Sequence, residues 1–150
     1  MKISRLRILV VGRANAGKPT VLSRVCNTLE NPTLYDSAIE RDCGEHDIEN
    51  EMVFQSNPGF IFHDSRGSET GGESEFDKVK AFIMDRSRLK NQLHVIWYCI
   101  PMDEARRSFT KGEIKFFSQC DTGSGKLSHL TVVDVQLMRR ISILSFIHKV

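Results

Sequence analysis

The chain has 150 residues, 40% of them hydrophobic, and its 21 Lys and Arg against 19 Asp and Glu give a formal net charge of +2. This length and apolar content suit one globular domain with a core and exclude a disordered chain. The near-neutral charge gives no electrostatic case for nucleic acid or an anionic membrane as a partner. Because no apolar run approaches the roughly 20 residues of a membrane span, we expect a soluble, cytoplasmic protein.

The first motif follows an apolar, strand-like run over residues 6–11 and reads Gly12-Arg13-Ala14-Asn15-Ala16-Gly17-Lys18. The residues after this motif have apolar side chains at the spacing of one helix face: Val21, Leu22, Val25 and Leu29. In the phosphate-binding pattern G-x-x-x-x-G-K-[ST], backbone N–H groups surround phosphate oxygens, the lysine adds a charge, and the next helix points its positive end at the anion. Gly12, Gly17 and Lys18 occupy the fixed positions. The alternative is a glycine-rich turn that binds nothing.

The hydroxyl position of this pattern holds Pro19, and Thr20 comes one place late. Proline fits the first turn of a helix well. It supplies neither the N–H that donates to phosphate nor the hydroxyl that binds Mg²⁺. Since a hydrogen bond to a charged group is worth about 1.5–3 kcal/mol, we expect weakened binding of Mg²⁺ and nucleotide.

The next part of the chain predicts a stop at Pro32, a polar loop over residues 35–47, and two antiparallel strands. Residues 48–55 alternate in part, with charges that suit an edge strand, and a turn at 56–59 leads to a short buried strand at 60–63. That strand ends in Asp64-Ser65-Arg66-Gly67. Downstream of a phosphate loop, such an aspartate can hold the Mg²⁺ shell, and the glycine N–H can reach a γ-phosphate.

Two helices and a central strand are predicted further along. Ser74-Glu75-Phe76-Asp77 resembles a capping box at the start of a helix with one apolar face. Residues 93–100 are apolar almost throughout, as in a central parallel strand, with His94 in the core or at the strand end. A helix starting at Pro101-Met102-Asp103 should turn these side chains toward the sheet: Ala105, Phe109, Phe116, Phe117 and Cys120.

The sequence leaves alternatives open for the end of the chain and for the four cysteines. After a loop at residues 121–126, the remainder either adds a strand and a short element or forms a poorly packed tail. The four cysteines are widely spaced, without a C-x-x-C pair. This spacing favours reduced thiols, with Cys26, Cys99 and Cys120 on apolar faces, over a zinc site or disulfides.

With these motifs, residues from about Leu6 to Thr122 resemble the amino-terminal half of a small Ras-like or Era-like P-loop GTPase (G) domain. Residues 44–54, 63–67 and 97–103 look like a fungal group of such proteins. The resemblance implies an α/β, three-layer P-loop NTPase-like fold with a mostly parallel sheet, incomplete at the carboxyl end. It implies a partial G domain over residues 1–122 and an atypical tail over 123–150.

The resemblance also implies GTP or GDP and Mg²⁺ as ligands, with a protein effector as a further partner. It assigns to the nucleotide Gly12, Asn15, Ala16, Gly17, Lys18, Thr20, Asp64 and Gly67. Asp64 is the metal candidate, through water. Ser68 stands where Ras-like members place a water-orienting glutamine, so no catalytic residue carries over.

No N-K-x-D or T-K-x-D guanine-reading motif follows Cys120. A truncated or misread gene product would account for the unrelated segment after residue 122. The sequence therefore predicts GTP binding with weak or absent hydrolysis. The alternative is a truncated, non-catalytic interaction fragment that binds nucleotide poorly, and an ATP-using P-loop enzyme ranks last.

Overall fold

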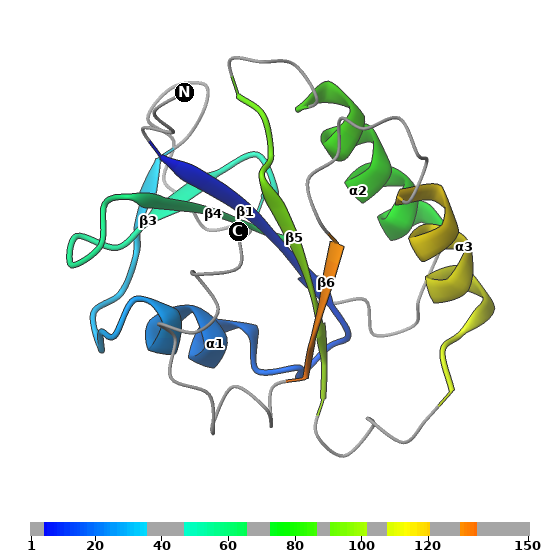
Figure 1. Cartoon of the computed structure of the whole chain (residues 1–150), viewed down its shortest axis with the longest axis horizontal. Coiled ribbons are helices and arrows are strands. Elements are labelled where there is room, and N and C mark those ends of the chain that lie inside the picture. Colours follow the sequence, from blue (N-terminus) through cyan, green and yellow to red (C-terminus); the bar gives the residue numbers. More distant parts are fainter. Residues whose placement is uncertain are drawn as a thin grey trace.

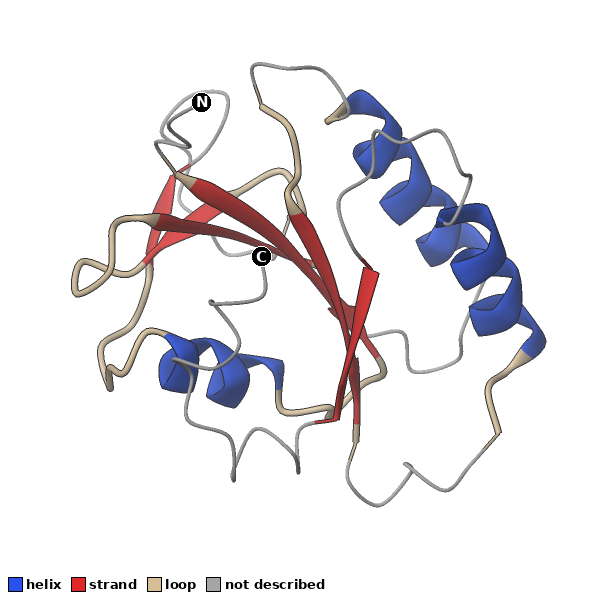
Figure 2. Cartoon of the chain, viewed as in Figure 1, coloured by secondary structure: helices blue, strands red, loops and turns tan. Residues whose placement is uncertain are grey.

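A computed structural model describes residues 5–35, 47–65, 73–86, 91–101, 108–120 and 130–134. They form a six-stranded sheet in the order β2-β3-β4-β1-β5-β6 with helices on both faces (Figures 1 and 2). The strands are β1 Leu6–Gly12, β2 Thr33–Tyr35, β3 Glu51–Val53, β4 Phe60–Asp64, β5 Val95–Ile100 and β6 Leu130–Asp134. The helices are α1 Lys18–Val25, α2 Glu73–Asp85 and α3 Lys111–Cys120.

The sheet is mostly parallel, as predicted. β1 lies at its centre between β4 and β5, parallel to both, and β6 runs parallel to β5. β3 pairs antiparallel with β4 across the predicted turn at residues 56–59. Because β1, β4 and β5 point the same way, their carboxyl ends meet at one edge of the sheet.

Alternating residues of β1 divide the core into two layers. Ile8 and Val10 pack with α1 on one face, and Leu9 and Val11 pack with α2 and α3 on the other. Figure 1 shows α1 apart from the α2 and α3 pair, with the sheet between them. Strands that are covered on both faces need a nearly continuous apolar sequence. For this reason the sequence predicts β1 and β5 as buried strands. The predicted three-layer α/β arrangement is confirmed.

The outer strands differ from the prediction. β2 was not predicted, because the side chains of Thr33, Leu34 and Tyr35 are all exposed and carry no buried pattern. It pairs antiparallel with β3, so the prediction that β3 is an edge strand is wrong. The strand expected over residues 48–55 is shorter, since Asn50 N–H donates to Asp47 O in a turn (3.0 Å).

The helix boundaries also differ. α1 ends at Val25 and the chain turns through Asn27, whose φ is 50°, so Leu29 is fully exposed and not on the apolar face. α2 begins one residue before Ser74, which therefore cannot be its N-cap. α3 begins at Lys111 with Thr110 as its cap, and residues 108–110 before it are not helical, whereas Met102 and Asp103 of the predicted start lie outside the described residues.

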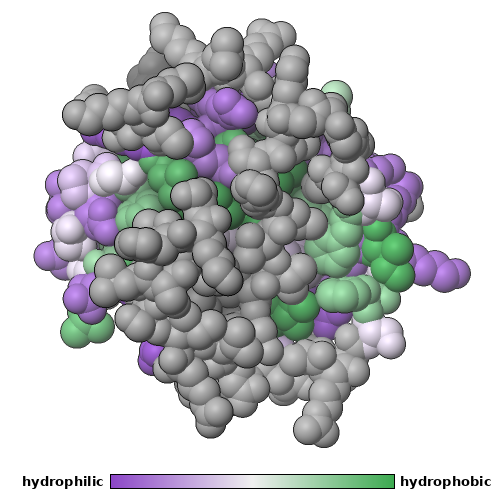
Figure 3. Space-filling model, in the orientation of Figure 1, coloured by the Kyte–Doolittle hydropathy of each residue, from purple (hydrophilic) through white to green (hydrophobic). Residues whose placement is uncertain are grey.

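Several large hydrophobic side chains are exposed on or next to α2 and α3. The space-filling view shows hydrophobic surface on the right of the molecule (Figure 3), and Met84, Phe109 and Ile114 are exposed. Phe109 was expected to face the sheet, and instead its ring contacts the Phe117 ring, with centroids 5.2 Å apart, from a half-exposed position. Among the described helices, none combines the length and the apolar character needed to cross a bilayer.

Candidate phosphate-binding loop

The segment between β1 and α1 turns through two residues with left-handed backbone. Asn15 and Gly17 adopt left-handed φ angles of 57° and 69°. Ala16 N–H donates to Arg13 O (3.3 Å), and Val21 N–H donates to Gly17 O (3.1 Å) where the helix begins. Left-handed residues among right-handed ones turn successive N–H groups toward the same concavity, and a helix amino terminus adds positive potential. Asparagine and glycine are the residues that adopt this conformation at least cost.

Gly12 is required by the close approach of β5. It pairs with Cys99, and a Cβ built on Gly12 would lie 2.3 Å from Cys99 O. The next residue, Arg13, donates its N–H to the same carbonyl oxygen (3.2 Å). The loop therefore leaves the sheet directly against the β5 backbone, and a larger residue at position 12 would displace one of the two.

Lys18 and Asp64 come to the same edge of the sheet. Lys18 begins α1 and is only 7% exposed, so its side chain is not extended into solvent. Asp64 ends β4 and is paired in register with Val10. Burial raises the pKa of the Cys99 thiol to about 12, the Lys18 charge opposes that shift, and the Asp64 charge adds to it. Both charges therefore act at the end of β5.

The other predicted residues are distributed around the loop. Asn15 is exposed on its surface, Ala16 is buried beneath it, and Thr20 is exposed on α1. Gly67, together with Arg66 and Ser68, lies outside the described residues. The structure thus brings Gly12, Gly17, Lys18 and Asp64 to the carboxyl ends of the neighbouring strands β1 and β4.

The described residues at the loop supply few ligands for a metal ion. Pro19 lies in the first turn of α1 without an N–H or a hydroxyl, and Thr20 is exposed. Asp64 is the one predicted metal candidate, and in the described part of the chain no three His, Cys, Asp or Glu side chains gather into a metal site. Mg²⁺ usually keeps waters and needs only one or two carboxylates plus the phosphates of its nucleotide. A metal held here would depend on the nucleotide for most of its oxygen ligands.

An ion pair that the sequence does not predict lies at the start of the loop. Arg13 donates from Nε to Glu113 Oε1 (2.6 Å) and from Nη2 to Glu113 Oε2 (2.9 Å). Tyr98 Oη donates to Oε1 (2.6 Å), and Thr110 N–H donates to Oε2 (2.7 Å). The two side chains are 12% and 3% exposed. Burial opposes ionisation of Glu113, but these hydrogen bonds outweigh it and lower the pKa of its carboxyl to about 2.

Part of this arrangement has a sequence signal. Thr110-Lys111-Gly112-Glu113 matches the capping box S/T-x-x-E, and Glu113 N–H donates in return to Thr110 Oγ1 (3.2 Å). The pattern would have located the start of α3 and a buried carboxylate. The partner of that carboxylate, 100 residues away in the chain, had no sequence signal.

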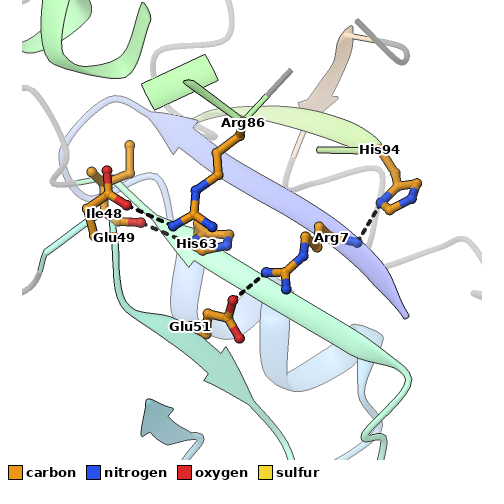
Figure 4. A network of polar contacts seen from close by, with 7 residues as sticks. All are labelled: Arg7, Ile48, Glu49, Glu51, His63, Arg86 and His94. Atoms are coloured by element: carbon orange, nitrogen blue, oxygen red, sulfur yellow. Dashed lines mark hydrogen bonds and ion pairs between the residues drawn. The ribbon is translucent and has the colours of Figure 1, made fainter. Parts of the chain in front are cut away.

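A second polar network lies on the α2 face of the sheet (Figure 4). His63, next to Asp64, is fully buried with Nδ1 2.9 Å from Ile48 O, and its ring packs on Phe82. Burial lowers the pKa of His63. Arg86 Nη2 donates to Glu49 Oε2 (2.8 Å) from the end of α2. These contacts join the turn before β3 to β4 and α2.

The same network extends to the start of β1. Arg7 forms an ion pair with Glu51 on β3, and its N–H donates to His94 Nδ1 (3.0 Å) (Figure 4). His94 thus lies just before β5 in a structural role, as predicted. This end of β1 is opposite to the end that carries the loop.

The described cysteines are free and buried. Cys26 and Cys99 both belong to the core on the α1 face. Burial raises the pKa of Cys26 to about 11, so neither thiol is a ready nucleophile at neutral pH. The prediction that Cys26 and Cys99 lie on apolar faces is confirmed, whereas Cys43 and the side chain of Cys120 lie outside the described part.

Neither a family model nor a curated protein matches this sequence. Among solved structures, the chain is similar to the G domain of the T. maritima FeoB iron transporter. The identity is 16% and the TM-score 0.45, over 97% of this chain and 82% of that domain. The similarity concerns architecture, and no ligand of this chain follows from it.

Proposed function

We propose that this protein binds the phosphates of a nucleotide in the loop between β1 and α1. The observation that carries the proposal is the loop itself, with left-handed Asn15 and Gly17 directly before a helix that begins at the buried Lys18. Backbone N–H groups and a helix amino terminus recognise phosphate without regard to the base. Gly12, Asn15, Ala16, Gly17 and Lys18 would surround the phosphates.

GTP is the proposed ligand, on the basis of the G-domain resemblance of the sequence. Asp64 would lie near Mg²⁺ through water, and Gly67 would contact the γ-phosphate. With Pro19 in place of the hydroxyl and Ser68 in place of glutamine, Mg²⁺ would bind weakly and hydrolysis would be slow or absent. Residues 1–122 would carry the partial G domain, and residues 123–150 an atypical segment that includes β6.

The test is a titration with fluorescently labelled GTP, GDP and ATP, each with Mg²⁺ and with EDTA. We expect micromolar binding of GTP, a small dependence on Mg²⁺, and loss of binding in Lys18→Ala at unchanged secondary structure. Lys115→Ala is the matched control, because Lys115 is an exposed lysine of α3 and is not part of the loop. The absence of binding up to millimolar nucleotide would favour the alternative of an interaction fragment.

Hydrolysis needs a separate measurement. Purified protein saturated with GTP should release inorganic phosphate no faster than about the slow intrinsic rate of G domains without an activating partner, on the order of 10⁻⁴ per second. Turnover on the scale of an ordinary enzyme, about 1–10³ per second, would contradict the assignment of weak or absent hydrolysis.

A further inference from the structure

We propose that Glu113 is the positioning residue of the phosphate loop: it holds the Arg13 side chain toward α3 and thereby fixes the first turn of the loop. This inference rests on the proposed function. Arg13 is the first residue after Gly12, so anything that fixes Arg13 also fixes where the loop leaves the sheet.

The geometry of the pair supports a fixing role. Both oxygens of Glu113 accept from Arg13, and each accepts a further hydrogen bond, from Tyr98 or from Thr110. A bidentate arginine and carboxylate pair constrains orientation as well as distance. With both side chains nearly buried, the pair is little screened by solvent. Removing one partner alone would leave an uncompensated buried charge.

The direction of Arg13 separates its charge from the proposed phosphate site. By the alternation of β1, Arg13 continues the face of Leu9 and Val11, which packs against α2 and α3. The loop then proceeds to α1 on the opposite face, where Lys18 is buried. Glu113 therefore keeps the guanidinium on the α3 side. Arg13 N–H, bonded to Cys99 O, completes the anchor through the backbone.

The decisive variant removes the link without changing net charge. In Arg13→Gln/Glu113→Gln, one positive and one negative charge are lost together, so long-range attraction of the anion is preserved. The matched control is Arg7→Gln/Glu51→Gln, which is also charge-neutral and breaks an ion pair at the opposite end of β1. Binding of GTP and of inorganic tripolyphosphate is measured without Mg²⁺ by calorimetry, and stability by urea unfolding.

We expect the Arg13/Glu113 variant to bind both probes about tenfold more weakly, a coupling of ordinary size between neighbouring elements. The control should lose stability while its Kd stays at the wild-type value. A merely structural pair would lower stability in both variants and leave Kd unchanged in the folded protein. Equal Kd values for wild type and the Arg13/Glu113 variant overturn the inference alone. If wild type binds neither probe, the proposed function fails and the inference fails with it.

Hydrogen exchange in the wild type tests the same link should the variant not fold. Because the coupling between two sites is reciprocal, tripolyphosphate in the loop should slow exchange of the amides of Thr110 and Glu113. The amides of β3 serve as the internal control. Unchanged exchange at Thr110 and Glu113 in protein saturated with tripolyphosphate would overturn the inference.

Discussion

Pro19 follows the buried Lys18 in the first turn of α1, and its carbonyl accepts a hydrogen bond from Ser23 Oγ (3.0 Å). Replacing it by threonine restores both groups that the loop lacks. We expect Pro19→Thr to strengthen Mg²⁺-dependent GTP binding by about tenfold or more, the value of one hydrogen bond to a charged group plus a metal ligand. Titrations with Mg²⁺ and with EDTA measure the difference.

Pro19→Ala is the control, because it restores the N–H without the hydroxyl. It should improve binding equally with Mg²⁺ and with EDTA, and by less than threonine does. If Pro19→Thr binds GTP no better than wild type, the proline does not limit the loop.

Substitution of Gly12 should lower the free energy of unfolding. In Gly12→Ala the new methyl group would meet the Cys99 carbonyl oxygen at 2.3 Å, and two central strands would have to separate. We expect a loss of about 1–3 kcal/mol, as for overpacked cores, seen as a lower urea midpoint. In the control Gly59→Ala, the nearest contact is Asn57 Oδ1 at an ordinary 3.7 Å, so the midpoint should change little. Equal midpoints for Gly12→Ala and wild type would contradict the close approach.

At the scale of elements, the cap of α3 can be tested directly. Thr110 Oγ1 accepts the N–H of Glu113, which Thr110→Ala leaves without its partner. We expect a loss of about 1 kcal/mol, the usual value of an N-cap, and recovery in Thr110→Ser. Ser118→Ala serves as the control. Ser118 is exposed within α3, and among the described residues its hydroxyl donates a hydrogen bond to Lys115 O in the same helix. A loss as large in Ser118→Ala would show that capping is not the cause.

The elements that the sequence predicted well are those whose burial leaves a periodic pattern. β1, β4 and β5 are apolar runs, and α2 shows one apolar face through Phe76, Val79 and Phe82. The sequence does not predict β2, because this strand pairs with β3 through its backbone and buries none of its side chains. Spacing alone predicts that Leu29 belongs to α1, but the helix ends at Val25 and the chain turns at Asn27.

The candidate site was predictable to the extent that it is local in sequence. Gly12, Gly17 and Lys18 stand in one motif, and the strand end placed Asp64 beside them. The Arg13 and Glu113 pair depends on β5 and α3 being packed together, which no local pattern encodes.

In the whole molecule, the loop joins both layers of the core. On one face it leads into α1, and on the other it is tied to α3 through Glu113. The ion pair of Arg7 with Glu51 joins the start of β1 to β3, and that of Arg86 with Glu49 joins the end of α2 to the turn before β3. Stability and loop geometry therefore depend on contacts between distant segments, and acid should weaken the contact made by Glu113 before it affects the apolar layers.

The pH dependence of unfolding tests this view. The pKa of Glu113 is about 2 in the folded protein against an ordinary value of 4.5, so the unfolded chain binds the proton more readily. The stabilisation is complete above pH 4.5 and is lost as the pH falls from 4.5 toward 2, at about 1.4 kcal/mol for each pH unit within that window. We expect Glu113→Gln to be less stable than wild type at pH 7 and to approach it below pH 3. Urea unfolding from pH 7 to pH 2.5 measures the difference, in which the other acidic groups cancel. A gap that stays constant over this range would mean that Glu113 titrates normally and is not held by Arg13.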